Sequence, residues 1–177
     1  MREYELNTDS LRAAIPSLAV GDRVFLTGTV YTSRDAAHKE LSRLLDEGGH
    51  LPFPLQDAVI YYAGPTPGHG DMAVGSCGPT TSARMDGFAP RLYRLGVAAT
   101  IGKGERDETV KQAIRETGAV YLCAVGGAGA LIARHITSAE EIAFPELGCE
   151  SVKRLTVDHL PLIVAVDSAG NDIFQRK

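Results

Sequence analysis

The sequence has no tryptophan and only three cysteines among its 177 residues. Cys77, Cys123 and Cys149 are widely spaced and form no CxxC pair, which argues against a disulfide framework and against a metal site held by this chain alone. Cys123 lies in the apolar run AVYLCAV, which is typical of a small core residue. If the protein uses a metal cluster, we therefore expect another chain to hold it.

Strong charge and long apolar runs are also missing. The formal net charge is -4 with no run of five like charges, so we expect no nucleic-acid partner. The apolar stretches 119–125 and 160–166 are shorter than the roughly 20 residues that span a bilayer. The first ten residues, MREYELNTDS, have no apolar signal core. We therefore expect a cytoplasmic protein that does not contact membranes.

Several catalytic signatures are absent. The sequence lacks a full GxGxxG fingerprint and the GxxxxGK[ST] loop, which argues against dinucleotide binding and nucleotide hydrolysis. It also lacks GxSxG and HExxH, so neither a nucleophile and its base nor a zinc-protease pair can be read from it. Any chemistry in this chain alone looks incomplete.

The length and the 44% hydrophobic content predict one domain with a real core, covering residues 1–177. Apolar patterns predict strands near residues 23–32, 58–63, 97–101 and 119–125, and helices near 34–47 and 107–117. Ser33 or Thr32 is expected to cap the first helix, Gly48 to end it, and Asp107 to cap the second. A short helix and two antiparallel strands should follow, giving an α/β or α+β fold with a mixed sheet flanked by helices.

The densest polar chemistry lies in GSCGPTTSARMD, residues 75–86. Apolar spacing from Met85 to Leu95 predicts a helix of about four turns beginning near Thr80 or Thr81, which Pro90 should kink or divide. A helix start rich in hydroxyls can bind an anion through its unpaired amides. Arg84, one turn later, could grip a carboxylate, although a capped helix with a solvated arginine fits equally well.

Two further segments place cations at strand ends. TSRDAAHKEL puts Arg34 and His38 on one face of a helix start, with Asp35 either orienting His38 or capping the helix, unless the group is only a surface charge cluster. IGKGE puts Lys103 between two glycines after a strand. Arg34, Arg84 and Lys103 together would suit a substrate with two carboxylates.

These motifs, in this order, carry a family resemblance. GDRVFLTGTVYTSRDAAH, YYAGPTPG, GSCGPTTSARMD, IGKG, GGAGAL and ELGCESV…LPLIVAVDSAGN resemble the C-terminal domain of class I fumarases and the separate small (β) subunits of fumarase and L-tartrate dehydratase. The resemblance covers residues 20–172. The chain departs from the family at Cys77, where a small or apolar residue is expected, and at Lys153, where a large aromatic residue is expected.

The resemblance implies a swivelling β/β/α domain that closes over a partner α subunit carrying a four-iron four-sulfur (4Fe-4S) cluster. It implies that Arg34, Arg84, Lys103 and Thr81 bind a C4 dicarboxylate substrate and that Thr80 is the catalytic base. Because a threonine hydroxyl is a weak base, that role needs strong activation. Family members often form a dimer of α–β units.

The substrate and even catalysis remain open at this stage. Asp86 in SARMD favours fumarate hydration to malate, since tartrate enzymes of the family tend to have Glu there, with Asp35, His38 and Asp86 as supporting residues. The first alternative is the β subunit of L-tartrate dehydratase. The others are a non-catalytic dicarboxylate-binding module and a simple dimerisation domain.

Overall fold

The structure is a computed structural model that describes residues 1–125 and 127–175. Gly126, the first glycine of the GGAGAL motif, lies outside the described residues. No helix in the described part is long and apolar enough to cross a bilayer. The strands are β1 (Glu3–Asn7), β2 (Arg23–Thr32), β3 (Val59–Tyr61), β4 (Ala99–Gly102), β5 (Val120–Cys123), β6 (Ile136–Ala143) and β7 (Val152–Val166). The α-helices are α1 (Leu11–Ala14), α2 (Asp35–Glu47), α3 (Ala89–Arg94), α4 (Glu108–Thr117) and α5 (Gly129–Ala133), and the 3₁₀ helices are η1 (Thr8–Ser10), η2 (Ile15–Ser17), η3 (Ser82–Met85) and η4 (Pro145–Glu150).

The seven strands form one mixed sheet in the order β1-β2-β3-β4-β5-β7-β6. Strands β2 to β5 are parallel, whereas β7 runs antiparallel to both β5 and β2. Because β7 pairs with β2 as well as with β5, the strands β2, β3, β4, β5 and β7 close into a ring of pairings. The predicted mixed sheet flanked by helices is confirmed. The last two strands do form an antiparallel pair, but β7 closes the main sheet instead of standing apart.

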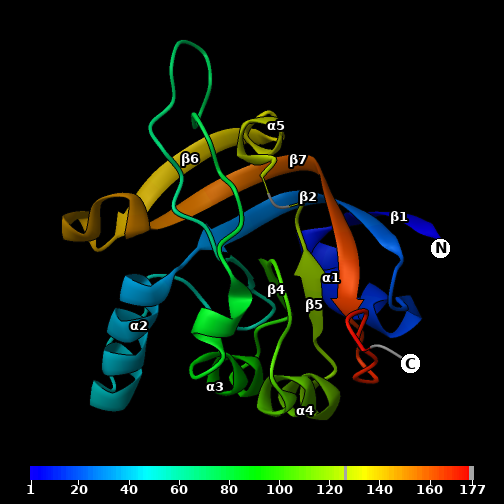
Figure 1. The fold of residues 1–177 in the computed structure, drawn as a ribbon. Coiled ribbons are helices and arrows are strands. Elements are labelled where there is room, and N and C mark those ends of the chain that lie inside the picture. Colours follow the sequence, from blue (N-terminus) through cyan, green and yellow to red (C-terminus); the bar gives the residue numbers. More distant parts are fainter. Residues whose placement is uncertain (126, 176–177) are drawn as a thin grey trace.

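Side chains of the central strands alternate between two hydrophobic clusters. On β3, Val59 and Tyr61 belong to the cluster that includes Leu26, while Ile60 belongs to the cluster under the helices. This alternation is what a strand with both faces buried requires. Figure 1 shows α2, α3 and α4 on the lower side of the sheet and the loop after β3 rising on the opposite side, beside β6 and α5.

Helix α2 begins differently from the prediction. Arg34 occupies the N-cap position, and no side chain caps the helix. Thr32 donates its hydroxyl to the Ser151 carbonyl at 3.3 Å instead. The predicted ends at Gly48, which has a φ of 66°, and at Asp107, which accepts from the Val110 amide at 2.9 Å, are confirmed. Thr32 is therefore used for a tertiary contact, and the Ser33 hydroxyl contacts the His38 ring within α2 at 2.8 Å.

The expected helix over residues 80–95 is divided. Only η3 forms at Ser82–Met85, and α3 starts at Ala89. Pro90 lies in the first turn of α3, where a missing amide costs no hydrogen bond. The division that Pro90 predicts is confirmed, but a helix start able to expose several free amides does not form there.

Candidate active site

Four segments far apart in sequence meet at the carboxyl ends of β2, β3 and β4. The Ser33 amide donates to the Tyr61 carbonyl at 3.0 Å, and the Thr80 amide donates to the Tyr62 carbonyl at 2.7 Å. The Ser82 amide donates to the Lys103 carbonyl at 2.9 Å, so the loop is attached to the ends of both β3 and β4. The strand ends thus bring the predicted site residues together at one edge of the sheet.

Two of the predicted cations share one carboxylate. Arg84 donates from Nε to Asp35 Oδ1 at 2.9 Å, and Arg34 Nη2 lies 3.9 Å from Asp35 Oδ2. The Arg84 side chain is 53% exposed and the Arg34 side chain 24% exposed, so neither guanidinium is enclosed. Asp35 therefore neither caps α2 nor touches His38, but holds two arginines side by side.

Thr81 and Lys103 lie side by side at the same edge. They form an isolated parallel bridge between the loop and the end of β4, and both side chains are exposed. Within the described residues, the Lys103 ammonium has no ion-pair partner. Lys103 is therefore available to an incoming anion.

Thr80 is half-buried beside them. Its amide is used by Tyr62, and no hydrogen bond to its hydroxyl forms among the described residues. The amides of Thr80 and Ser82 are occupied and η3 has only four residues, so the predicted anion-binding helix start does not form here. No side chain that could act as an activating base for Thr80 bonds to it in this part of the chain.

His38 points inward. Its Nδ1 lies 2.8 Å from Ser33 Oγ and 2.9 Å from the Arg34 carbonyl oxygen, while its buried Nε2 has no hydrogen-bond partner in the described structure. Burial lowers the pKa of His38 to about 4, so the ring is neutral at pH 7. A neutral, buried His38 fixes the backbone at Arg34 instead of presenting a charge to a substrate.

Asp86 is also turned away from the open edge. It accepts from Arg106 Nε at 2.7 Å and from the Asp107 amide at 2.8 Å. The Arg106 side chain is 0% exposed and lies over the rings of Tyr62 and Tyr121, at 5.3 and 4.8 Å from the ring centroids. This buried pair links the segment that carries Arg84 to the segment that follows Lys103. Asp86 therefore supports the site through the loops and not by contact.

Sequence reasoning missed Arg106, and no local signal marks it. It sits between Glu105 and Asp107 in a charged stretch that reads as solvent-exposed. Only the fold brings Tyr62, Thr100 and Asp86 around its guanidinium, with Thr100 Oγ1 accepting at 3.1 Å and the Tyr62 hydroxyl at 3.2 Å.

The residues of this chain do not fit an iron-sulfur cluster. Among residues 1–125 and 127–175, no three His, Cys, Asp or Glu side chains come together in a way that could hold a metal ion. Cys77 is buried, and burial raises its pKa to about 12, which disfavours the thiolate that a metal requires. Cys123 donates to the Tyr121 hydroxyl at 3.4 Å, and Cys149 is exposed on η4.

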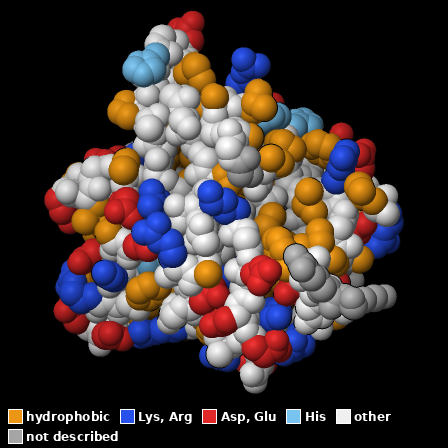
Figure 2. Space-filling view, viewed as in Figure 1, with side chains coloured by type: hydrophobic (Ala, Val, Ile, Leu, Met, Phe, Trp, Pro, Cys, Tyr) orange, Lys and Arg blue, Asp and Glu red, His pale blue; other side chains and the backbone are white. Residues whose placement is uncertain are grey.

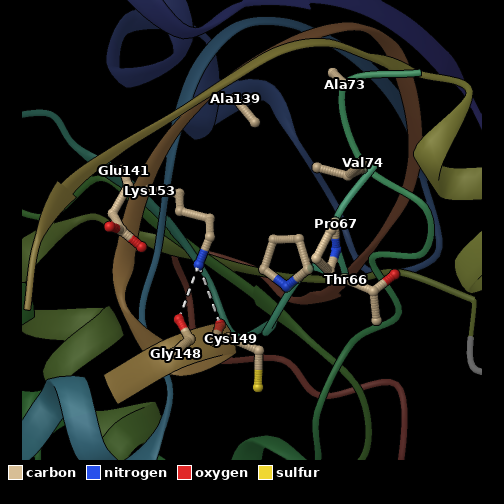
Figure 3. A pocket seen from close by; sticks show the side chains of 10 residues that line it. Thr66, Pro67, Ala73, Val74, Ala139, Glu141, Gly148, Cys149 and Lys153 are labelled. Atoms are coloured by element: carbon tan, nitrogen blue, oxygen red, sulfur yellow. Dashed lines mark hydrogen bonds between the residues drawn. The ribbon is translucent and has the colours of Figure 1, made fainter. Parts of the chain in front are cut away.

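A cavity of about 420 Å³ lies beside the site, between the loop after β3 and the β6–η4–β7 hairpin. Figure 3 shows Lys153 extending across it toward the carbonyls of Gly148 and Cys149. Those contacts measure 3.4 and 3.3 Å, and a third, to Ser151 Oγ, measures 2.7 Å. The Lys153 ammonium is therefore held at the wall of the cavity by η4 and Ser151.

The outer surface carries no broad patch of one charge on the face seen in Figure 2. Lys and Arg side chains alternate there with Asp and Glu over the helical side. The cations at the edge of the sheet consequently act through close contacts and not through a large field.

Comparison with known proteins connects this geometry to a family. The family model described as "Fumarase C-terminus" matches residues 1–177. The chain is 39% identical over 166 residues to "Fumarate hydratase class I, anaerobic" of Escherichia coli K12, covering 93% of this chain and 30% of that protein. It is 37% identical over 170 residues to "Fumarate hydratase 2" of Leishmania major, again 30% of that protein's length and 95% of this chain. It is 39% identical over 179 residues to "Putative L(+)-tartrate dehydratase subunit beta" of Methanocaldococcus jannaschii, covering 98% of this chain and 91% of that protein.

Proposed function

Because the chain belongs to the fumarase C-terminus family, we propose that it is the β subunit of a hydro-lyase that hydrates fumarate reversibly to malate. Relatives in this family are named as fumarate hydratases and as a tartrate dehydratase subunit. The chain spans about 30% of the length of those two fumarate hydratases, and we place the remainder of the site on an α subunit.

The observation that carries the proposal is the meeting of Arg34 and Arg84 at Asp35, with an exposed Lys103 on the same edge of the sheet. Three cations against the carboxylates of Asp35 and Glu150 leave a net positive charge at this edge for an anionic substrate. Guanidiniums can grip a carboxylate with two parallel hydrogen bonds, and the ammonium can hold the second carboxylate as a point charge.

We assign the roles as follows. Arg34, Arg84, Lys103 and Thr81 bind and orient the two carboxylates of the substrate. Thr80 takes the proton from carbon during dehydration of malate, and a group on the α subunit handles the proton at the hydroxyl. The positive charges beside Thr80 favour the alkoxide form that this step needs.

The iron-sulfur cluster is assigned to the α subunit. When bound there, it would supply Lewis-acid chemistry toward the substrate. The cysteines of this chain do not fit a cluster, so every role given to this chain concerns binding, orientation and proton transfer. We expect the active form to be a dimer of α–β units.

L-tartrate is the second candidate substrate. The archaeal relative named as a putative tartrate dehydratase β subunit is matched along 91% of its own length. Asp86, which favoured fumarate in the sequence, is enclosed by Arg106 and the Asp107 amide and does not face the substrate. Discrimination must therefore be measured.

The experiment is anaerobic coexpression with a candidate cluster-bearing α subunit, followed by assays with malate, fumarate and L-tartrate. We expect turnover of the fumarate–malate pair by the copurified complex and none by this chain alone. Faster turnover of tartrate would move the assignment to tartrate dehydratase. A stable complex that turns over none of the three would favour a non-catalytic dicarboxylate-binding module.

A further inference from the structure

Glu150 approaches Arg34 from a distant part of the chain. It is the last residue of η4, and its Oε1 lies 3.6 Å from Arg34 Nε. Both of these atoms are buried, and neither has a hydrogen-bond partner among the described residues. Each is therefore the nearest opposite charge available to the other at that position.

The two carboxylates around Arg34 occupy neighbouring sides of its guanidinium. Glu150 faces Nε and Asp35 faces Nη2, whereas Nη1 lies toward Gly64. A Cβ added at Gly64 would lie 3.4 Å from both Nη1 and Cδ of Arg34, so glycine lets the backbone pack closely against this side of the arginine. The guanidinium is thus restrained by carboxylates at Nε and Nη2 and by the Gly64 backbone near Nη1.

A separate network fixes η4, which carries Glu150. Lys153 donates to the carbonyls of Gly148 and Cys149 and to Ser151 Oγ, and Ser151 in turn donates to Glu141 Oε2 at 2.7 Å. These bonds tie the turn between β6 and β7 to both strands. Lys153, at a position where the family resemblance predicts a large aromatic residue, therefore stabilises this turn through hydrogen bonds.

From these contacts we propose that Glu150 is a positioning residue for Arg34, held in place by the Lys153 network. It sets the orientation in which the guanidinium meets a substrate carboxylate. This inference rests on the proposed binding role of Arg34. Glu150 itself does not touch the substrate.

The kinetic test compares Glu150→Ala, Glu150→Gln and Glu146→Ala in the copurified complex. Glu146 is an exposed glutamate of the same 3₁₀ helix and serves as the control. We expect Glu150→Ala to raise KM by about tenfold with a smaller change in kcat, because a charged contact to a binding arginine is lost. Glu150→Gln, which keeps the size of the side chain but not its charge, should also raise KM, and Glu146→Ala should behave as wild type.

A second readout needs no catalysis. The Arg34 Nε–H signal is followed by NMR in the ¹⁵N-labelled full-length chain and assigned by its loss in Arg34→Lys. We expect Glu150→Ala, but not Glu146→Ala, to shift this signal and to speed its exchange with water. An unchanged Arg34 signal, or a wild-type KM for either Glu150 variant, would overturn the positioning role. An inactive wild-type complex would instead refute the proposed function, and the NMR result would still decide the contact.

Discussion

Asp86→Ala should destabilise the protein strongly, because it leaves the guanidinium of Arg106 buried without its counter-charge. The Arg106 side chain is 0% exposed and cannot reach water without opening the loop. Removing one partner of a buried ion pair costs about 3–5 kcal/mol. Since about 1 kcal/mol shifts Tm by about 2–4 °C in a chain of this size, we expect Tm to fall by about 6–20 °C.

The assay is urea and thermal unfolding followed by far-ultraviolet circular dichroism. Asp46→Ala is the matched control, since Asp46 pairs with Arg91 at 2.6 Å but its side chain is 68% exposed. An exposed pair contributes at most about 1 kcal/mol. Equal Tm shifts for Asp86→Ala and Asp46→Ala would refute the buried-pair reasoning. So would a Tm shift for Asp86→Ala that is unchanged in a background where Arg106 is replaced by leucine.

Three further outcomes are expected. Because burial lowers the pKa of His38 to about 4, the unfolded chain binds one more proton than the folded chain between pH 6.5 and 4. The free energy of unfolding should therefore fall by about 2 kcal/mol from pH 7 to pH 5. Urea unfolding of His38→Gln over the same pH range should lack this part of the pH dependence. Gly64→Ala should raise KM several-fold, because its Cβ would lie 3.1 Å from the Cys149 carbonyl oxygen and 3.4 Å from Arg34 Nη1. Gly87→Ala should leave KM unchanged, because its Cβ would meet nothing within 4 Å. Thr80→Ala should lower kcat much more than it changes KM, and comparable losses in both would make Thr80 a binding residue.

The sequence predicted those parts of the fold that depend on local pattern. The strand RVFLTGTVYT, the helix that ends at Gly48 and the helix capped by Asp107 all appear, because apolar spacing and capping residues act within a few positions. Strand β1 was missed. It is a five-residue edge strand whose pairing with β2 comes from the backbone and leaves little trace in its side chains.

Long-range contacts explain the remaining differences. The ring closes because β7 pairs with β2, a register that no local pattern contains. The helix expected after Thr80 is divided between η3 and α3, and Asp86 at the end of η3 is bound by Arg106 from the segment after β4, a contact that no local pattern contains.

The candidate site was predictable to a similar degree. Arg34, Arg84 and Lys103 follow or neighbour the ends of parallel strands, and the fold brings them to one edge, as strand-end position suggests. The directions of His38 and Asp86 were not predictable, because both depend on partners that only the folded chain supplies. The same holds for Glu150, which meets Arg34 where η4 packs beside the start of α2.

The most direct test of the central claim, that this chain binds the substrate carboxylates, is the KM for fumarate of the copurified complex carrying Arg84→Met or Arg91→Met. The two arginines are matched, since each is exposed and each pairs with an aspartate, Asp35 or Asp46. We predict that Arg84→Met raises KM about tenfold or more, because a charged contact to the substrate is lost, while Arg91→Met leaves KM unchanged. Equal, wild-type KM values for both variants would contradict the account.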